Sequence, residues 1–246
     1  MQTRQAVRIS EELRKRFARA QSVMVLTGAG ISAESGVPTF RSGGKTAVWK
    51  GMPFDVISSA RMVQQDLPRV WEWFDYRRNL LQSLRPNPAH YELVRWQHRF
   101  PQFTLVTQNV DGLHQKAGSR DVIELHGNIW RARCVSCRAS YEIVGAERPD
   151  ACAGCGEWLR PDVVLFGEML PDGAFELSAA RAARCELCFV IGTSALVYPA
   201  ASLPEIANKA GAFICEVNPE RTPLSTLCDE VLTGMAGEVV PLIGES

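Results

Sequence analysis

Features that would direct the chain to a membrane or a polyanion are missing from the sequence. No run of about 18 apolar residues occurs, which excludes a transmembrane helix by length. The N-terminal region lacks the charged segment, short apolar core and cleavage site of a signal peptide. Because 27 basic residues balance 27 acidic ones, no general attraction to nucleic acid or an anionic membrane is expected. We predict a cytoplasmic protein that binds neither nucleic acid nor a membrane, with its oligomeric state left open.

Cysteine is also sparse. Eight cysteines among 246 residues are too few for a disulfide-stapled scaffold, and clustered thiols in a reducing compartment more often hold a metal. The length fits one large domain, or one domain that carries a small insertion. A content of 46% hydrophobic and 22% charged residues is ordinary for a globular enzyme.

Short apolar runs bounded by turn residues predict the strands. They lie at 23–27, 104–107, 122–125, 163–166, 187–191 and 213–217. Each is apolar on both faces, as in a parallel sheet that helices cover. Helical patterns near Glu34 and at 88–100, 174–184 and 200–211 separate several of these runs. The alternation predicts an α/β fold with a doubly wound, mostly parallel, Rossmann-like sheet.

Two segments interrupt this alternation. Residues 43–84 are rich in aromatic side chains, in a mostly helical pattern without a strand candidate. Residues 129–159 contain four cysteines, few aliphatic residues and several turn formers. We therefore predict a helical insertion at 43–84 and a metal-stabilised module at 129–159. The Rossmann-like domain comprises the remaining segments, 1–42, 85–128 and 160–246.

Two C-x-x-C pairs, separated by 14 residues, predict a metal site in the second of these segments. The four cysteines are Cys134, Cys137, Cys152 and Cys155. Two such pairs supply the tetrahedral sulfur shell that Zn²⁺ favours, and a closed shell stabilises the fold without taking part in chemistry. A redox pair is the weaker alternative, because one dithiol needs only one C-x-x-C. A third C-x-x-C, Cys185 and Cys188, could add ligands, but we interpret both residues as buried thiols. The two remaining cysteines, Cys215 and Cys228, are interpreted in the same way.

The turn Gly28-Ala29-Gly30 follows a predicted strand and precedes a predicted helix. Backbone N–H groups at such a helix start can bind a pyrophosphate. The full dinucleotide pattern also requires an acidic residue about 20 positions later, but residues 47–50 read Ala-Val-Trp-Lys. No Gly-Lys-Ser/Thr follows at the spacing of a Walker loop, so the turn is not one. Other residues must complete the site.

Compact polar groups follow four other predicted strands. They are Gln108, Asn109 and Asp111; His126; Gly192, Thr193 and Ser194; and Asn218. Open α/β sheets bind ligands at the carboxyl ends of their strands, where these groups lie. A site explains so many polar strand ends better than a set of ordinary turns. The other histidines, His90, His98 and His114, have no comparable neighbours in the sequence and are interpreted as helix or loop residues.

At these residues the sequence resembles the sirtuins, a family of NAD-dependent protein-lysine deacylases. The matching segments are GAGISAESGVPTFR (28–41), TQNVDGLHQKAG (107–118), ELHGN (124–128), the four cysteines, RPDVVLFGE (160–168), GTSALVYPAA (192–201) and EVN (216–218). They cover nearly the whole chain in family order. The resemblance implies the fold described above, with an NAD-binding Rossmann-like domain and a zinc-binding module.

The resemblance also implies the roles of individual residues. His126 is expected to be the catalytic base, with Asn109 as a second catalytic residue. NAD is expected to contact Gly28, Ala29, Gly30, Phe40, Arg41, Gln108, Asn109, Asp111, Gly192, Thr193, Ser194 and Asn218. The acyl-lysine peptide or protein is expected to enter as an added strand along Val164, Phe166, Gly167 and Glu168. Its acyl group would transfer to ADP-ribose with release of nicotinamide.

The insertion at 43–84 resembles the class III branch, some members of which remove succinyl groups through a Tyr-x-x-Arg pair in the acyl pocket. In this sequence the pair falls on Phe74 and Arg77. The guanidinium could bind a carboxylate, but the missing hydroxyl removes a hydrogen bond worth about 0.5–1.5 kcal/mol. We expect deacetylation, with removal of succinyl groups as a second candidate activity.

Two further functions remain open at this stage. A mono-ADP-ribosyltransferase or NAD glycohydrolase could cleave NAD in the same pocket. A zinc-containing module that senses NAD without turnover is the nonenzymatic alternative. Dependence of nicotinamide release on acyl-lysine separates the deacylase from both.

Overall fold

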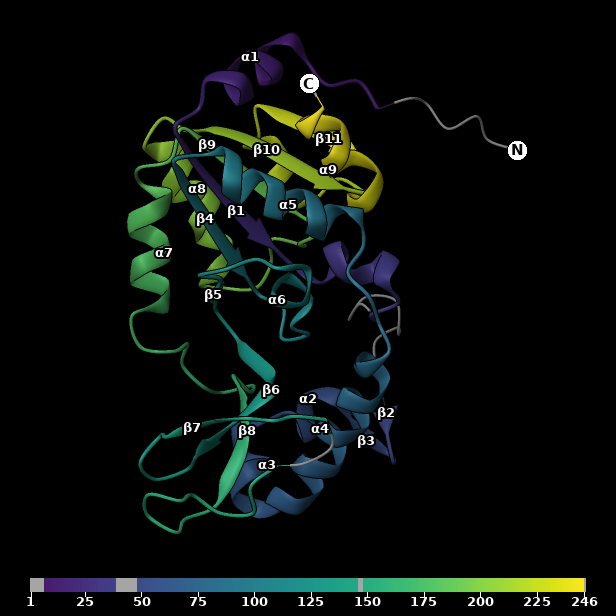
Figure 1. Ribbon diagram of the computed structural model, residues 1–246, viewed down its shortest axis with the longest axis vertical. Coiled ribbons are helices and arrows are strands. Elements are labelled where there is room, and N and C mark those ends of the chain that lie inside the picture. The colour runs from purple at the N-terminus through teal and green to yellow at the C-terminus, as the bar shows by residue number, and fades with distance from the viewer. Residues whose placement is uncertain (1–6, 39–47, 146–147, 246) are drawn as a thin grey trace, which may run out of the picture.

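The computed structural model describes residues 7–38, 48–145 and 148–245, which form two lobes (Figure 1). The larger lobe contains a six-stranded sheet in the order β11-β10-β9-β1-β4-β5, with every neighbouring pair parallel. The strands are β1 (Ser22–Thr27), β4 (Gln102–Thr107), β5 (Ile123–Glu124), β9 (Leu187–Ile191), β10 (Phe213–Asn218) and β11 (Glu230–Thr233). Chain order reverses between β1 and β9, as in dinucleotide-binding sheets. The predicted doubly wound sheet is confirmed.

Helices cover both faces of this sheet. One face carries α1 (Glu11–Arg19), α5 (Pro88–Arg99) and α9 (Ala236–Gly244), and the other carries α7 (Ala174–Ala182) and α8 (Leu203–Lys209). Phe17, Trp96 and Phe189 form the centre of the first apolar layer, with ring centroids 4.8–6.1 Å apart. The strands between the layers are largely buried, as their unbroken apolar runs predicted. Among the described residues, no helix is long and apolar enough to cross a lipid bilayer.

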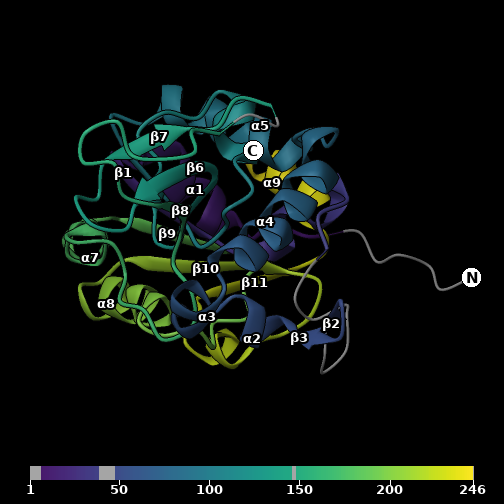
Figure 2. The same cartoon turned by 90° about the horizontal axis from the view of Figure 1, so that it is seen from below.

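The second lobe combines the two insertions. It contains β2 (Val48–Trp49), β3 (Met52–Pro53), α2 (Phe54–Ile57), α3 (Ala60–Gln65), α4 (Leu67–Gln82), and the antiparallel sheet β7-β6-β8 with β6 (Gly127–Cys134), β7 (Ser140–Glu142) and β8 (Leu159–Val163). Trp71 of α4 joins the apolar cluster of Cys134 and Cys152, and its Nε1 donates a 2.8 Å hydrogen bond to Leu159 O. The helical and cysteine-bearing insertions therefore pack as one body, which Figure 2 shows from below.

The structure corrects the predicted strand at 163–166. Strand β8 ends at Val163 and pairs antiparallel with β6, outside the parallel sheet. The following residues bond to the helical insertion instead, since Phe166 N donates to Ser58 O at 2.9 Å. Residues 160–163, predicted in the Rossmann-like domain, consequently belong to the small sheet. The apolar run alone does not reveal which sheet a strand joins.

Two other elements have weak sequence patterns. Strand β11 is a four-residue edge strand that is only partly buried, so it lacks the apolar run of the central strands. The strands β2 and β3 form a two-residue pairing inside the segment where no strand is predicted. Elements this short contain too few residues to establish a period of two.

The strand directions place the predicted site between the lobes. The carboxyl ends of β1 and β4 point toward the second lobe (Figure 1). The chain leaving β5 passes through His126 directly into β6 of that lobe. The polar residues that follow β1, β4, β5 and β9 therefore meet at this junction.

Candidate active site

Close backbone contact between two loops shapes the first part of the site. A Cβ atom on Gly28 would lie 2.7 Å from Thr193 Cβ, and one on Gly30 would lie 2.6 Å from Gly192 Cα. Gly28 N and Gly30 N donate to Ile191 O and Gly192 O at 3.0 and 2.7 Å. The glycines thus allow the loops after β1 and β9 to touch, and their N–H groups are already bonded. The element that follows, Ala29–Ser35, is a 3₁₀-helix.

Side chains link the ends of three strands. Gln108 Nε2, after β4, donates to Thr193 Oγ1 at 3.0 Å. Asn218 Nδ2, at the end of β10, donates to Thr193 O at 2.8 Å. Ser194 lies beside this contact and is half-buried. The structure therefore brings these four predicted residues together at the sheet edge where the strand order reverses.

Asn109 connects the glycine turn to a buried polar cluster. Its Nδ2 lies 3.0 Å from Gly28 O and 3.3 Å from Ser32 Oγ. Asp111 is buried and accepts a 2.8 Å hydrogen bond from Leu113 N. Burial raises the pKa of Asp111, while the hydrogen bonds from Leu113 and Ser32 and the charge of Arg77 oppose that shift. Whether the Asp111 carboxyl group is charged therefore depends on its contacts with Leu113, Ser32 and Arg77.

His126 has one ring nitrogen available for chemistry. Its Nδ1 lies 2.8 Å from Gln108 O, and because a carbonyl only accepts, Nδ1 carries the hydrogen. In the neutral ring Nε2 therefore holds the lone pair. Burial lowers the pKa of His126, against the opposing effect of the Gln108 hydrogen bond. Near neutral pH the ring is accordingly a neutral base with a fixed tautomer.

The loop after β8 lies beside this histidine. Val164 N donates to His126 O at 2.9 Å, and Ala60 N donates to Phe166 O at 3.0 Å. Phe166 is 53% exposed, and its ring centroid lies 5.4 Å from that of Phe54. Within the described residues, Val164 O and Gly167 N make no hydrogen bond. An extended peptide could therefore add its own main-chain bonds at these groups.

Four cysteine thiols form a metal site in the second lobe. The Sγ atoms of Cys134, Cys137, Cys152 and Cys155 all lie within 4.8 Å of one another. Ser136 N and Cys137 N each lie 3.4 Å from Cys134 Sγ, so backbone N–H groups support the sulfur. This donor set fits Zn²⁺ with no position left for a reactant. The predicted clustering of these four cysteines, in positions suited to bind Zn²⁺, is confirmed.

The other four cysteines do not form a comparable cluster within the described residues. Cys185, Cys188 and Cys215 are buried, and Cys228 is partly buried. A hydrogen bond with Cys185, together with burial, raises the pKa of Cys188 well above the ordinary thiol value, and burial does the same for Cys215. These properties agree with the interpretation of buried apolar thiols.

The predicted acyl-pocket residues have different surroundings. Phe74 is 1% exposed and belongs to an apolar cluster with Ile57 and Val70. Burial lowers the pKa of Arg77, whereas the nearby Asp111 raises it, and the Arg77 guanidinium lies 5.7 Å from the Trp73 ring. The charge of Asp111 thus already acts on Arg77, and Phe74 is part of the core. The predicted NAD contacts Phe40 and Arg41 lie outside the described residues.

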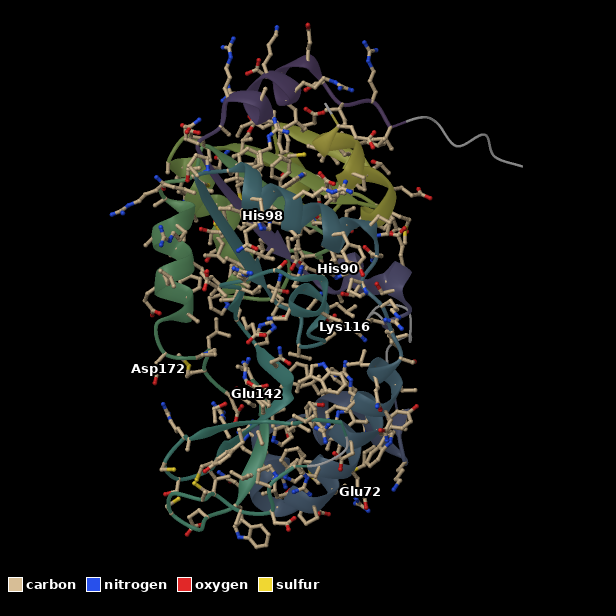
Figure 3. All side chains as sticks on the ribbon, viewed as in Figure 1. Glu72, His90, His98, Lys116, Glu142 and Asp172 are labelled. Carbon is tan, nitrogen blue, oxygen red and sulfur yellow. The ribbon has the colours of Figure 1, made fainter. Side chains whose placement is uncertain are left out.

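Two buried histidines next to the site were not predicted. The rings of His90 and His114 lie 4.9 Å apart. His114 Nε2 is 3.0 Å from Thr27 Oγ1, and His90 Nε2 is 3.4 Å from Ser32 Oγ. Figure 3 shows His90 at the end of α5 nearer the second lobe and His98 toward the other end. In the sequence, only the closeness of His114 to Asp111 indicates that it lies near the site. The contact between His90 and His114 depends on tertiary structure.

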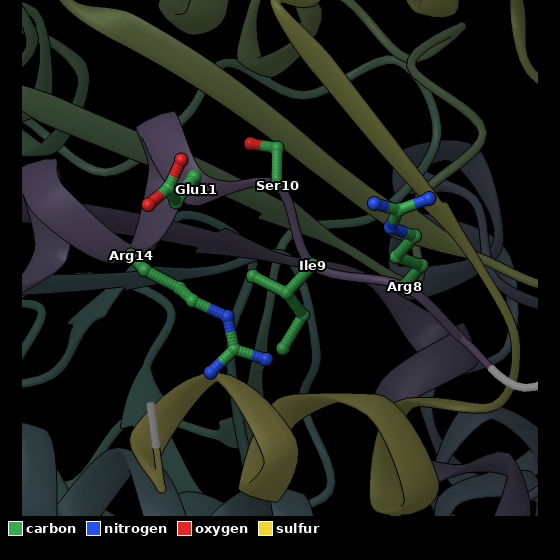
Figure 4. A pocket seen from close by; sticks show the side chains of 5 residues that line it. All are labelled: Arg8, Ile9, Ser10, Glu11 and Arg14. Atoms are coloured by element: carbon green, nitrogen blue, oxygen red, sulfur yellow. The ribbon is translucent and has the colours of Figure 1, made fainter.

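A surface hollow at α1 lies away from all these groups. It is lined by Arg8, Ile9, Ser10, Glu11 and Arg14 (Figure 4). Ser10 N donates to Glu230 Oε1 at 2.8 Å, which places the hollow at the amino ends of the strands. It brings together none of the predicted site residues.

The strand order, the polar strand ends and the four-cysteine cluster define a Rossmann-type α/β protein whose second lobe has a cluster of thiols suited to Zn²⁺. The family model described as the Sir2 family matches residues 28–199. The chain belongs to the Sir2 family, and the sirtuin resemblance is confirmed.

Relatives and solved structures align with nearly the full length of this chain. The NAD-dependent protein deacylase of Aquifex aeolicus is 46% identical over 211 residues, 85% of this chain and 87% of the relative. An NAD-dependent protein deacylase of Thermus thermophilus is 46% identical over 239 residues, 95% and 93% of the two chains. A solved Sir2 homolog–NAD complex aligns with a TM-score of 0.89 at 40% identity, covering 99% and 95%. A solved structure of a Sir2 bound to acetylated peptide aligns with a TM-score of 0.82 at 28% identity, and the alignment covers 97% of this chain and 98% of the other.

Proposed function

We infer that the protein is an NAD-dependent protein-lysine deacylase that transfers the acyl group from lysine to ADP-ribose and releases nicotinamide. The observation that carries this inference is the geometry of His126. Its Nδ1 is held by Gln108 O at 2.8 Å, and burial keeps the ring neutral. A base with a fixed tautomer thus lies where the strands of the NAD-binding sheet end. The family membership and the deacylase relatives support the same reaction.

NAD is a substrate in this reaction, because its glycosidic bond to nicotinamide breaks. The weakly nucleophilic amide oxygen of the acyl-lysine attacks the ribose carbon that nicotinamide leaves. Proximity and exclusion of water supply most of the rate for such a step. His126 Nε2 then accepts the proton of a ribose hydroxyl, whose oxygen attacks the former amide carbon. The bond from that carbon to the lysine nitrogen breaks, and the amine leaves with a proton. Water then adds to the acyl carbon, and the bond from this carbon to the oxygen on the first ribose carbon breaks, so that the acyl group remains on the attacking ribose oxygen. Asn109 fixes the adjacent glycine turn through Gly28 O.

The residues proposed to bind NAD surround the linked strand ends. They are Gly28, Ala29, Gly30, Phe40, Arg41, Gln108, Asn109, Asp111, Gly192, Thr193, Ser194 and Asn218. Because the N–H groups of Gly28 and Gly30 are bonded within the protein, we assign these glycines to close packing rather than direct phosphate donation. Side chains such as Ser194 and Asn218 then provide polar contacts.

The acyl-lysine peptide is proposed to lie along Val164, Phe166 and Gly167. Main-chain pairing at Val164 O and Gly167 N gives affinity for an extended segment while specifying few flanking side chains. We propose acetyl-lysine as the preferred substrate over succinyl-lysine. The support is that Phe74 supplies no hydroxyl group and that the charge of Asp111 already acts on Arg77.

Zinc holds the second lobe together and takes no part in this chemistry, because four thiolates complete its coordination. We also propose that the protein works in the cytoplasm. Its eight cysteines carry no disulfide, and a reducing compartment keeps thiols available for zinc.

The test follows nicotinamide release with NAD, in the presence and absence of an acetyl-lysine peptide. The wild-type protein should release nicotinamide only with the peptide and form acetyl-ADP-ribose in equal amount. His126→Ala should lower the rate at least about 100-fold, since it removes the base, while zinc content and unfolding temperature persist. His98→Ala, on exposed α5 surface, is the matched histidine control. Release without peptide would favour an NAD glycohydrolase, and an active His126→Ala would refute the assigned base.

A further inference from the structure

A chain of alternating charges runs along the junction of the lobes. Arg131 of β6 contacts Glu124 of β5 at 2.5 Å and Asp162 of β8 at 3.0 Å. Arg133, two residues further along β6, contacts Asp162 at 3.9 Å and Glu168 at 3.7 Å. This series of ion pairs thus connects the strand before His126 to the loop after β8.

Glu168, the last residue in this series of ion pairs, also forms a bidentate ion pair with Arg160. Arg160 Nη1 donates to Glu168 Oε1, and Arg160 Nη2 lies 3.0 Å from Glu168 Oε2. The side chains are only 7% and 16% exposed. Such parallel bonds fix both distance and orientation, and low exposure limits competition by water.

The same two side chains also bond to the backbone of the loop. Arg160 Nη2 donates to Val163 O at 2.9 Å, and Leu165 N donates to Glu168 Oε2 at 2.9 Å. Glu168 N in turn donates to Leu165 O at 3.0 Å. The ion pair therefore fixes the backbone on both sides of Val164 and closes the turn through Gly167.

Glu168 is predicted from the sequence to lie along the peptide, but its carboxylate points into the protein. What it holds in place are the two main-chain groups that the described residues leave free, Val164 O and Gly167 N. Val164 N is meanwhile bonded to His126 O at 2.9 Å. The loop is thereby fixed relative to the proposed base at one end and by the ion pair at the other.

We propose that Arg160 and Glu168 are positioning residues that preset the loop at 164–167 for strand addition by the acyl-lysine peptide. This proposal rests on the proposed function. The pair governs peptide affinity and leaves NAD affinity unaffected, because neither side chain belongs to the linked ends of β1, β9 and β10. Its loss frees the loop, so that binding must then order it.

The experiment measures KM for NAD and for an acetyl-lysine peptide separately. Glu168→Gln keeps the size of the side chain but weakens a charge-assisted pair, and we expect the peptide KM to rise about ten-fold or more. The NAD KM should stay within about two-fold, because sites without shared partners are nearly independent. Arg160→Lys keeps the charge but lacks the planar fork, so it should raise the peptide KM in the same way.

A matched control is an exposed ion pair that includes a residue close to Glu168 in sequence. Arg138 and Asp172 form a 2.7 Å ion pair whose side chains are 73% and 89% exposed, and Asp172 is seen at the edge of the molecule (Figure 3). Exposed pairs contribute little. Asp172→Asn should therefore leave both KM values at the wild-type level.

Several outcomes would overturn the proposal. One is a peptide KM at the wild-type level in Glu168→Gln, and another is an equal rise in both KM values, which indicates a general structural role. If Glu168→Gln does not fold, hydrogen exchange at Leu165 and Glu168 decides: it should be faster in Arg160→Lys than in the wild type, and equal rates refute positioning. A wild-type protein that never deacylates contradicts the proposed function instead, before any variant is compared.

Discussion

The buried pair His90 and His114 should make the protein less stable at acidic pH. Both rings are at most 1% exposed, and burial lowers the pKa of His90 to about 4, from an ordinary 6.5. The pKa of His114 also lies well below 6.5, through burial and the charge of His90. The folded protein therefore keeps both rings neutral at a pH where the unfolded chain binds protons.

The sign and size of the effect follow from proton linkage. Well above pH 6.5 both states hold a neutral His90, so there is no penalty. As the pH falls from 6.5 toward 4, the unfolded state binds more protons and the free energy of unfolding decreases. With these two pKa values, His90 alone removes about 2 kcal/mol between pH 7.5 and pH 5. That loss is a substantial part of a net stability of about 5–15 kcal/mol.

The perturbation that isolates this effect is His90→Gln. Glutamine cannot titrate, and it can still reach back to Asn87 N, which donates to His90 Nδ1 at 3.3 Å at the start of α5. Urea unfolding at pH 7.5 and pH 5 gives the free energy in each state. We expect the wild type to lose about 2 kcal/mol more than the variant over this interval, a difference of roughly 4–8 °C in Tm.

His98→Gln, an exposed change on the same helix, controls for removal of an imidazole from α5. Zinc dissociation at low pH affects the wild type and His90→Gln alike, so the comparison between them cancels it. His114 remains in the variant and leaves a residual decrease of the same sign. Equal losses in the wild type and His90→Gln would refute the argument that burial keeps this ring neutral.

The remaining predictions concern the metal and the acyl group. Cys152→Ser removes one of the four thiolates, so it should lower the zinc content below one ion per chain and should lower the temperature at which the β6–β8 sheet beside Trp71 unfolds. Metal analysis measures the first effect and intrinsic tryptophan fluorescence the second; a metal-free protein with the wild-type melting curve would contradict the prediction. Acetyl-lysine should show a higher kcat/KM than succinyl-lysine on the same peptide, because Phe74 offers no hydroxyl group; a preference for succinyl in a matched peptide series would refute this account of the pocket.

Local sequence patterns predicted those parts of the molecule whose residues are neighbours in the chain. The unbroken apolar runs of β1, β9 and β10 identify covered parallel strands, because burial on both faces leaves no polar alternation. The two C-x-x-C pairs identify the zinc site, because each pair positions two sulfurs by its own turn. His126 and Gln108 stand at strand ends, so the topology rule for parallel sheets places them at one edge.

Other features depend on contacts between segments that the chain separates widely. The strand predicted at 163–166 is wrong because pairing with β6, which lies much earlier in the chain, decides which sheet β8 joins. The glycine turn has its N–H groups occupied because Ile191 and Gly192 approach it in space. Glu168 points inward because Arg160 and Leu165 bond to it.

The sequence by itself determined the parallel sheet, the zinc cluster and the polar strand ends, since each follows from a periodicity or spacing within a short segment. Only the tertiary structure decided that the two insertions form one lobe, that His90 and His114 share a buried cluster, and that Arg160 and Glu168 hold the loop beside His126. The physical reason is that hydrogen bonds and burial act between atoms close in space. A sequence specifies those distances only through the whole fold.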